Sequence, residues 1–125
     1  MKKKYIAKLS ESEKSILVDS GTESPFSGEY DNFFNEGIYV CKACETQLFE
    51  SNCKFNSHCG WPSFDDAIKD AVIKRRDATL GRIRTEIICA ECNGHLGHVF
   101  EGENYTKKNT RYCVNSLSLK FIPIL

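Results

Sequence analysis

The sequence predicts a mainly β protein of short antiparallel strands with a short helix near its N-terminus. Two observations carry this prediction. From Gly37 onward, short β-like runs alternate with turn residues, and the last run has a two-residue period. The 125 residues are long enough for one domain with its own core. We therefore expect a single domain over residues 1–125, with residues 1–21 as a helical segment packed on it.

The N-terminal helix is predicted from its end signals. Ser10 is followed three residues later by Glu13, the reciprocal pair that satisfies free amides in a first helical turn. Gly21 offers a left-handed residue at the other end. We expect a helix over residues 11–20, followed by an irregular, Ser-, Gly- and Pro-containing segment over residues 22–30 that packs onto the domain.

The predicted strands are short and separated by turn residues. They cover residues 38–40, 47–49, 72–76, 82–88, 98–101, 111–115 and 117–122. In the last of them, Leu117, Leu119 and Phe121 alternate with residues of the other face, which predicts one buried face. Residues 64–73 fit a helical spacing almost as well as a loop that leads into a strand, so both alternatives stay open.

Charge and hydropathy exclude several classes of protein. The chain has 17 basic and 17 acidic residues, so it has no large positive field to hold a nucleic acid. No apolar run approaches the roughly 20 residues that cross a bilayer, and Lys2 to Lys4 are followed by mixed polar sequence instead of an apolar signal core. We expect a cytoplasmic monomer without a nucleic-acid or membrane partner.

Four of the seven cysteines form two C-x-x-C pairs, Cys41 with Cys44 and Cys89 with Cys92. This spacing lets both sulfurs of a tight turn face one cation, so the pairs together predict a closed tetrahedral zinc site with one ion per chain. Unbound buried cysteines would leave the paired spacing to chance, and a thioredoxin-type redox pair needs a βαβ pattern that we do not find. A closed site has no open coordination position, so the chemistry is expected elsewhere.

Cys113 is a candidate nucleophile because of its neighbours on a predicted strand. Residues two apart on a strand share a face, so Arg111, Cys113 and Asn115 project together. A guanidinium beside a thiol favours the thiolate, and an amide can hold a water or an oxyanion. The alternative is a small apolar residue on a buried strand beside a paired arginine.

Cys59 lies in a loop that Gly60 and Pro62 keep irregular, next to the flat apolar wall of Trp61. A loop cysteine can move to meet another sulfur. A bystander cysteine beside core-filling Trp61 and Phe64 fits this pattern equally well.

His95 and His98 lie three residues apart near a predicted turn. They could be metal ligands, acid/base groups or ordinary surface histidines, and four cysteines already suffice for zinc. A histidine that delivers a proton near neutral pH suits a reaction that expels oxygen. Cys53 has no patterned neighbourhood and receives no role.

Taken together, these residues resemble the methionine-R-sulfoxide reductases of the B type. The shared motifs run in the family's order across nearly the whole chain. Besides the two C-x-x-C pairs they are Cys59-Gly60-Trp61-Pro62-Ser63-Phe64, His95-Leu96-Gly97-His98-Val99-Phe100, Arg111-Tyr112-Cys113-Val114-Asn115-Ser116 and Ser118-Leu119-Lys120-Phe121. One departure is His58, because the family usually has Gly before this cysteine. The resemblance implies two antiparallel sheets arranged as a β-tent, with a few peripheral short helices.

The resemblance also implies an activity: thiol-dependent reduction of the R epimer of methionine sulfoxide, mainly in peptides or proteins. Cys113 would attack the sulfoxide sulfur while His98 protonates the oxygen, through a water held with Asn115. Cys59 would then resolve the sulfenic acid into a disulfide that thioredoxin or a similar dithiol reopens. Trp61 would cradle the substrate methyl group. The remaining expected pocket residues are His95, Phe100 and Arg111.

Two other classes of protein compete with this interpretation. One is a zinc-ribbon module that stacks nucleic acid on Trp61, Tyr105 and Tyr112, which the zero net charge disfavours. The other is a general dithiol oxidoreductase that acts on protein disulfides. The long sequence separation of Cys113 from its resolving partner favours the reductase.

Overall fold

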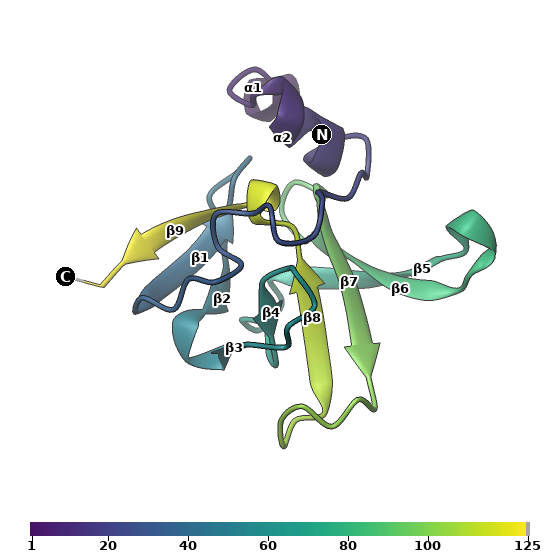
Figure 1. The fold of residues 1–125 in the computed structure, drawn as a ribbon. Helices are drawn as coiled ribbons and strands as arrows, with labels where there is room; N and C mark the ends of the chain where they lie inside the picture. The colour runs from purple at the N-terminus through teal and green to yellow at the C-terminus, as the bar shows by residue number, and fades with distance from the viewer. Residues whose placement is uncertain (125) are drawn as a thin grey trace.

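The computed structural model describes residues 1–124 and contains two antiparallel sheets, which lie on opposite sides of the molecule in Figure 1. The smaller sheet has the order β2-β1-β9, with β1 at Gly37–Cys41, β2 at Gln47–Glu50 and β9 at Leu119–Pro123. The larger sheet has the order β3-β4-β8-β7-β6-β5. Its strands are β3 (Lys54–Phe55), β4 (Ser63–Phe64), β5 (Val72–Asp77), β6 (Arg84–Cys89), β7 (His95–Glu101) and β8 (Thr110–Val114). The predicted mainly β fold with two sheets is confirmed.

The helices are short and lie at the periphery. Two α-helices, α1 (Lys3–Ile6) and α2 (Glu11–Leu17), pack together at one end of the molecule (Figure 1). Three 3-10 turns interrupt the loops: η1 (Ser51–Cys53), η2 (Thr79–Gly81) and η3 (Ser116–Ser118). No helix among residues 1–124 has the length and apolar character that a membrane span requires.

Helix α2 begins as its end signals predict, but it ends at Leu17 instead of at residue 20. The amide of Glu13 donates to Oγ of Ser10 at 3.1 Å, and the amide of Ser10 donates to Oε1 of Glu13 at 2.8 Å. The left-handed residue after the helix is Ser20 (φ 59°), not Gly21 as expected. Glycine is required at position 21 for a different reason, since a Cβ there would lie 2.7 Å from the carbonyl oxygen of Ser15.

Several strand boundaries differ from the predicted ones, and the two-residue strands β3 and β4 were not predicted. Strand β7 already begins at His95, so both histidines lie on a strand instead of near a turn. Strand β9 begins only at Leu119, because residues 116–118 form η3. Residues 65–71 form a loop and not a helix, so of the two alternatives for residues 64–73 the loop that leads into a strand is correct. This loop is attached to β2 by the amide of Ile68, which donates to the carbonyl of Leu48 at 2.9 Å.

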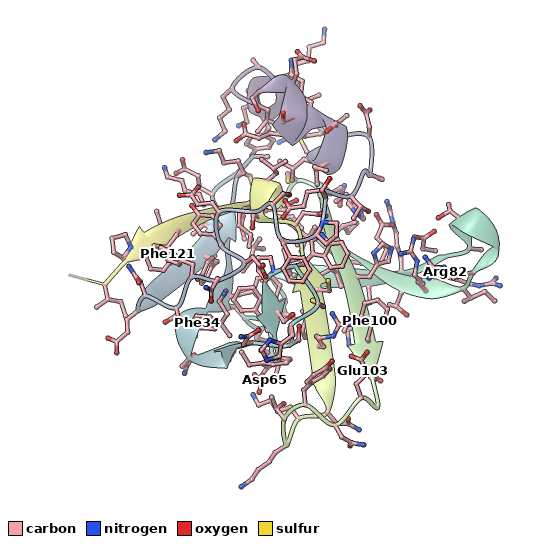
Figure 2. The ribbon with its side chains drawn as sticks, viewed as in Figure 1. Phe34, Asp65, Arg82, Phe100, Glu103 and Phe121 are labelled. Atoms are coloured by element: carbon pink, nitrogen blue, oxygen red, sulfur yellow. The ribbon has the colours of Figure 1, made fainter. Side chains whose placement is uncertain are left out.

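The core contains aromatic side chains from both sheets. Phe49 of β2 stacks on Phe64 of β4 with ring centroids 4.4 Å apart, and Tyr112 of β8 packs against Phe49 at 5.7 Å. Figure 2 shows Phe121 on β9 at one side of the molecule and Arg82 at the tip of the β5–β6 hairpin on the other. Because Tyr112 is buried in this core, it offers no surface on which a base could stack.

Candidate functional site

One face of the larger sheet carries a row of polar side chains from neighbouring strands. The strand register pairs His98 of β7 with Cys113 of β8 on one side and with Glu86 of β6 on the other. The row continues to Arg75 on β5 and to Ser63 on β4. Directly paired residues of antiparallel strands share a face, with Cβ atoms about 4.5–5.5 Å apart. The register thus places a thiol beside an imidazole.

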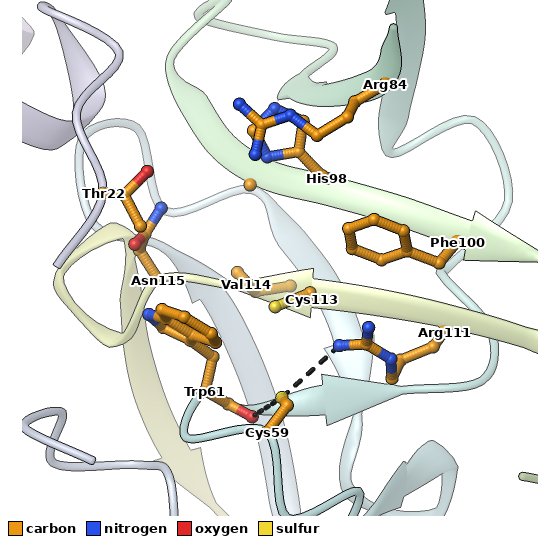
Figure 3. Close-up of a pocket in the computed structure, with 11 residues that line it drawn as sticks. Thr22, Cys59, Trp61, Arg84, His98, Phe100, Arg111, Cys113, Val114 and Asn115 are labelled. Atoms are coloured by element: carbon orange, nitrogen blue, oxygen red, sulfur yellow. Dashed lines mark hydrogen bonds between the residues drawn. The ribbon is translucent and has the colours of Figure 1, made fainter. Parts of the chain in front are cut away.

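Beside Cys113 this face borders a cavity of about 130 Å³ (Figure 3). Its walls bring together all but one of the predicted catalytic and substrate-binding residues. These are Cys59, Trp61, His98, Phe100, Arg111, Cys113 and Asn115. The other wall residues, for which the sequence carries no signal, are Thr22, Arg84, Gly97 and Val114. Cys53 lies in η1 and does not line this cavity.

His95 lies on the same face of the sheet because β7 contains a β-bulge. Residues three apart on a regular strand point to opposite faces. Here Ile88 pairs with His95 while the residue before Ile88 pairs with Gly97, so Leu96 is an extra residue in β7. The ring centroids of His95 and His98 are therefore only 5.6 Å apart. His95 itself lines an adjacent polar cavity of about 380 Å³ instead of the cavity at Cys113.

The environment of His95 favours the neutral form of its ring. Burial lowers the pKa of His95, which is 3% exposed. Its Nδ1 lies 2.5 Å from Oε2 of Glu86, and Nε of Arg75 donates to Oε1 of the same carboxylate at 2.6 Å. Although burial opposes ionisation of Glu86, these hydrogen bonds hold its pKa below the ordinary value. Nδ1 of His95 is therefore the protonated nitrogen, and Nε2 is free to accept a hydrogen bond.

The two cavity thiols hold one proton between them. A hydrogen bond from the thiol of Cys113 lowers the pKa of Cys59 to about 4, although burial opposes this shift. The same hydrogen bond, together with burial, raises the pKa of Cys113. The guanidinium of Arg111 favours a thiolate at Cys113, as expected, but the hydrogen bond to Cys59 and burial outweigh its effect. Arg111 also donates to Sγ of Cys59 at 3.4 Å (Figure 3). These opposite shifts make Cys59 the more acidic thiol of the pair, and its Sγ also lies 3.4 Å from the carbonyl oxygen of Trp61 (Figure 3).

Arg111 is held in place from two sides. Its Nε donates to Oε1 of Glu103 at 2.9 Å and its second terminal nitrogen donates to Oε2 at 3.3 Å, a two-point contact that fixes the plane of the guanidinium. The guanidinium also lies 4.6 Å from the ring centroid of Phe100. Strand register explains the second contact, because Phe100 and Arg111 are direct partners across β7 and β8.

Trp61 and Asn115 are positioned by the irregular segment that precedes β1. The indole Nε1 of Trp61 donates to the carbonyl oxygen of Glu23 at 3.0 Å, and the amide of Glu23 donates to Oδ1 of Asn115 at 3.0 Å. Nδ2 of Asn115 donates to the carbonyl of Leu96 at 3.0 Å. The side-chain amide of Asn115 is thus largely engaged within the protein, with one N–H left for a bound oxygen.

The cysteines of the two C-x-x-C pairs converge at a second site. Cys41 ends β1 and Cys89 ends β6, and each begins a tight turn with a left-handed residue, Glu45 (φ 64°) and Asn93 (φ 63°). In both turns the amide of that residue donates to the cysteine carbonyl at 2.8 Å. The two turns therefore have the same geometry, although they extend from different sheets.

The sulfur positions fit one tetrahedral metal ion. Sγ of Cys41 lies 3.6 Å from Sγ of Cys92, Sγ of Cys44 lies 3.5 Å from Sγ of Cys89, and all four atoms lie within 4.8 Å of one another. A zinc ion about 2.3 Å from each of four sulfurs requires sulfur separations of about 3.8 Å. The amide of Gly94 also donates to Sγ of Cys92 at 3.4 Å, which favours a charged sulfur. These four cysteines are positioned to bind a metal ion.

A β protein with two thiols, an imidazole and aromatic walls in one cavity has the features of a thiol-dependent oxidoreductase. Comparison with known families places it more narrowly, because the SelR domain family matches residues 9–123. The chain belongs to this family, that of the B-type peptide methionine sulfoxide reductases, which are oxidoreductases. The resemblance predicted from the motifs is confirmed.

Several relatives carry the name peptide methionine sulfoxide reductase. The B5 protein of Arabidopsis thaliana is 51% identical over 118 residues, which cover 94% of this chain and 84% of that protein. The MsrB protein of Bradyrhizobium diazoefficiens is 50% identical over 117 residues, with 92% and 83% coverage. The chloroplastic B3 protein of Oryza sativa subsp. japonica is 53% identical over 116 residues. That match covers 92% of this chain but only 50% of the rice protein. Because this relative is named chloroplastic, the expected cytoplasmic location of the present chain stays a prediction.

The fold is also found in a protein of different sequence. The crystal structure of the Mis18 "Yippee-like" domain superposes with a TM-score of 0.58 at 19% sequence identity. The match covers 72% of this chain and 98% of that domain. At this identity the likeness concerns the fold alone.

Proposed function

We propose that the chain reduces the R epimer of methionine sulfoxide, mainly in peptides and proteins, back to methionine. The observation that carries this proposal is the arrangement of Cys113, Cys59 and His98 around one cavity with Trp61 and Phe100 in its walls. An apolar aromatic wall suits the methyl group of the substrate, and the polar wall suits its oxygen. Membership of the family supports the same substrate class.

The reaction begins with the proton that the two thiols share. Cys113 passes its proton to the Cys59 thiolate and attacks the sulfoxide sulfur as a thiolate. His98 gives a proton to the sulfoxide oxygen, which leaves the substrate sulfur and ends on Cys113 as a sulfenic acid. The substrate sulfur is thereby reduced by two electrons and Cys113 is oxidised by two. Arg111 holds the sulfur pair in a positive field during these steps.

The second half of the cycle restores the thiols. Cys59 attacks the sulfenic sulfur of Cys113, the sulfenic oxygen leaves as water with the Cys59 proton, and a disulfide forms. Thioredoxin or a similar dithiol then reduces this disulfide by exchange. The metal ion at the four cysteines is zinc in this proposal, one per chain. Its role is structural, because four thiolates leave no open coordination position.

The decisive experiment compares the resolved R and S sulfoxides of a methionine peptide with a dithiol reductant. We expect turnover of the R epimer only. Reduction of insulin disulfides without any sulfoxide reduction would instead establish a general dithiol oxidoreductase.

Cysteine variants test the order of the two thiols. Cys113→Ser should release no methionine, because the nucleophile is gone. Cys59→Ser should release about one equivalent per chain and then stall with thioredoxin, because no nearby thiol resolves the sulfenic acid. Small dithiols can attack the sulfenic acid directly, so thioredoxin and dithiothreitol are compared.

Cys53→Ser is the control and should turn over normally. If Cys59→Ser also turns over normally and the added Cys53→Ser abolishes this, Cys53 is the resolving residue.

A further inference from the structure

Asp77, the last residue of β5, contacts the histidine that we assign as proton donor. Its Oδ2 lies 2.8 Å from Nε2 of His98, and Nη2 of Arg84 lies 3.6 Å from the same oxygen. The other oxygen, Oδ1, accepts hydrogen bonds from the amide of Thr79 at 2.9 Å and from its hydroxyl at 2.7 Å. Each carboxylate oxygen therefore has its own partners, and the orientation of Asp77 is fixed.

This contact determines which nitrogen of His98 carries a proton when the ring is neutral. The hydrogen bond from His98 holds the pKa of Asp77 well below its ordinary range, so the group is a carboxylate that can only accept. Nε2 must then be protonated. Nδ1 has no hydrogen-bond partner within residues 1–124, and His98 is part of the wall of the cavity at Cys113.

Other charged groups near His98 are engaged elsewhere. Glu86, its direct partner on β6, contacts His95 and Arg75 through its two oxygens. Arg84 lies beside Asp77. Cys113, the direct partner of His98 on β8, is hydrogen-bonded to Cys59. The ring of His95 packs edge-on against the ring of His98, and Nδ1 of His95 is hydrogen-bonded to Glu86. Asp77 is therefore the group that fixes the His98 ring.

We propose that Asp77 is a positioning residue that holds the Nε2 proton of His98, so that Nδ1 is the nitrogen that gives its proton to the sulfoxide oxygen. The inference rests on the proposed role of His98 as proton donor. In the transfer the Nδ1–H bond breaks and an O–H bond forms on the departing oxygen. The ring returns to its neutral form with the proton on Nε2, which the carboxylate stabilises, and water restores the Nδ1 proton.

The test replaces Asp77 by Asn, which keeps the shape and the bond to Thr79 but removes the negative charge. In a single turnover, methionine release from an R-sulfoxide peptide should slow about 10- to 100-fold, a typical effect of losing a hydrogen-bond partner of a functional histidine. The KM measured under steady-state turnover should change little. His98→Ala should slow it about 100- to 10,000-fold. Asp77→Glu should restore part of the lost rate.

A matched control is Asp66→Asn. Like Asp77, Asp66 accepts a hydrogen bond from a backbone amide, here that of Ala67, through one carboxylate oxygen. Its other oxygen pairs with Lys108, and the residue lies outside the cavity. The loss of one negative charge is the same in both variants. We expect Asp66→Asn to react at the wild-type rate and both variants to remain folded at the temperature of the assay.

Nitrogen-15 NMR of the His98 ring gives a readout that does not depend on turnover. The neutral ring should be the Nε2–H tautomer in the wild type, and the Nδ1–H tautomer should appear in Asp77→Asn. An unchanged tautomer together with a wild-type rate in Asp77→Asn, while His98→Ala is slow, overturns the role of Asp77 alone. Wild-type turnover in His98→Ala overturns the assignment of the proton donor, and the inference with it.

Discussion

At the scale of single residues, the shared proton of the two cavity thiols leads to a prediction about Cys59. Because the thiol of Cys113 is the main cause that lowers the pKa of Cys59 to about 4, Cys113→Ala should raise that pKa. The thiolate is the form that alkylating agents attack, and it is lost as the pH falls through the pKa. In the wild type, Cys59 should therefore react with iodoacetamide down to about pH 4 to 5, and in Cys113→Ala only at higher pH.

The measurement is the pH dependence of alkylation at each cysteine, followed by mass spectrometry of the peptides. Cys53 is an internal control, since burial raises its pKa and its reaction should begin only at alkaline pH in both proteins. The same pH midpoint for Cys59 in both proteins would contradict the shared proton.

The same scale shows which functional residues sequence reasoning can find. Strand alternation correctly predicts that Arg111, Cys113 and Asn115 share a cavity, because a period of two is a local property. It does not predict that Arg111 reaches Cys59, since that contact depends on a loop 52 residues away. Asp77 was missed because its partner His98 lies on another strand. The charged residues of segments 74–77 (Lys-Arg-Arg-Asp) and 84–86 (Arg-Thr-Glu) were the available signal of a polar face.

At the scale of elements, the close approach of β7 and β8 positions His98 beside Cys113. Gly97 makes this approach possible, because a Cβ there would overlap the carbonyl oxygen of Cys113. Gly97→Ala should push the strands apart, lower the free energy of unfolding by about 1–3 kcal/mol, and slow methionine release. Denaturant unfolding and a single-turnover assay measure the two effects.

Gly81→Ala is the comparison for this prediction. Gly81 lies in η2 at the tip of the β5–β6 hairpin, with open space where a Cβ would stand but with a left-handed φ of 70°. The Gly81→Ala substitution should lower the free energy of unfolding through backbone strain alone. Methionine release should therefore stay at the wild-type rate. Equal rates of methionine release for Gly97→Ala and the wild type would show that the strand spacing does not position the reacting groups.

Elements whose signals are local were predictable, and elements that depend on neighbours were not. The capping box of Ser10 and Glu13 and the alternating strands are local patterns, and the structure contains them. The bulge at Leu96 has no such signal, since it becomes visible only in the pairing of β6 with β7. It is this bulge that brings His95 and His98 to one face.

At the scale of the whole molecule, the two sheets are joined by the four-cysteine centre. Cys41 and Cys44 follow a strand of the smaller sheet, and Cys89 and Cys92 follow a strand of the larger one. The two C-x-x-C pairs predicted the cysteine cluster, and the long segment between them predicted that the site ties distant parts of the domain together. That these parts are two different sheets depends on where β1 and β6 end. A metal ion bound by these four cysteines would therefore join parts of the molecule that are distant in sequence.

We expect freshly purified protein to contain about one zinc per chain, measured by elemental analysis, and Cys41→Ser or chelation to unfold it or nearly so. The physical reason is one of magnitude. Binding of structural zinc contributes about 10–16 kcal/mol in small peptides, whereas a whole domain is stable by only about 5–15 kcal/mol. Cys53→Ser is the matched control, because it changes the same atom outside the cluster, and its thermal midpoint and zinc content should equal those of the wild type. Fully active protein with less than about a tenth of an equivalent of metal would contradict a structural zinc, since the two sheets would then hold together without it.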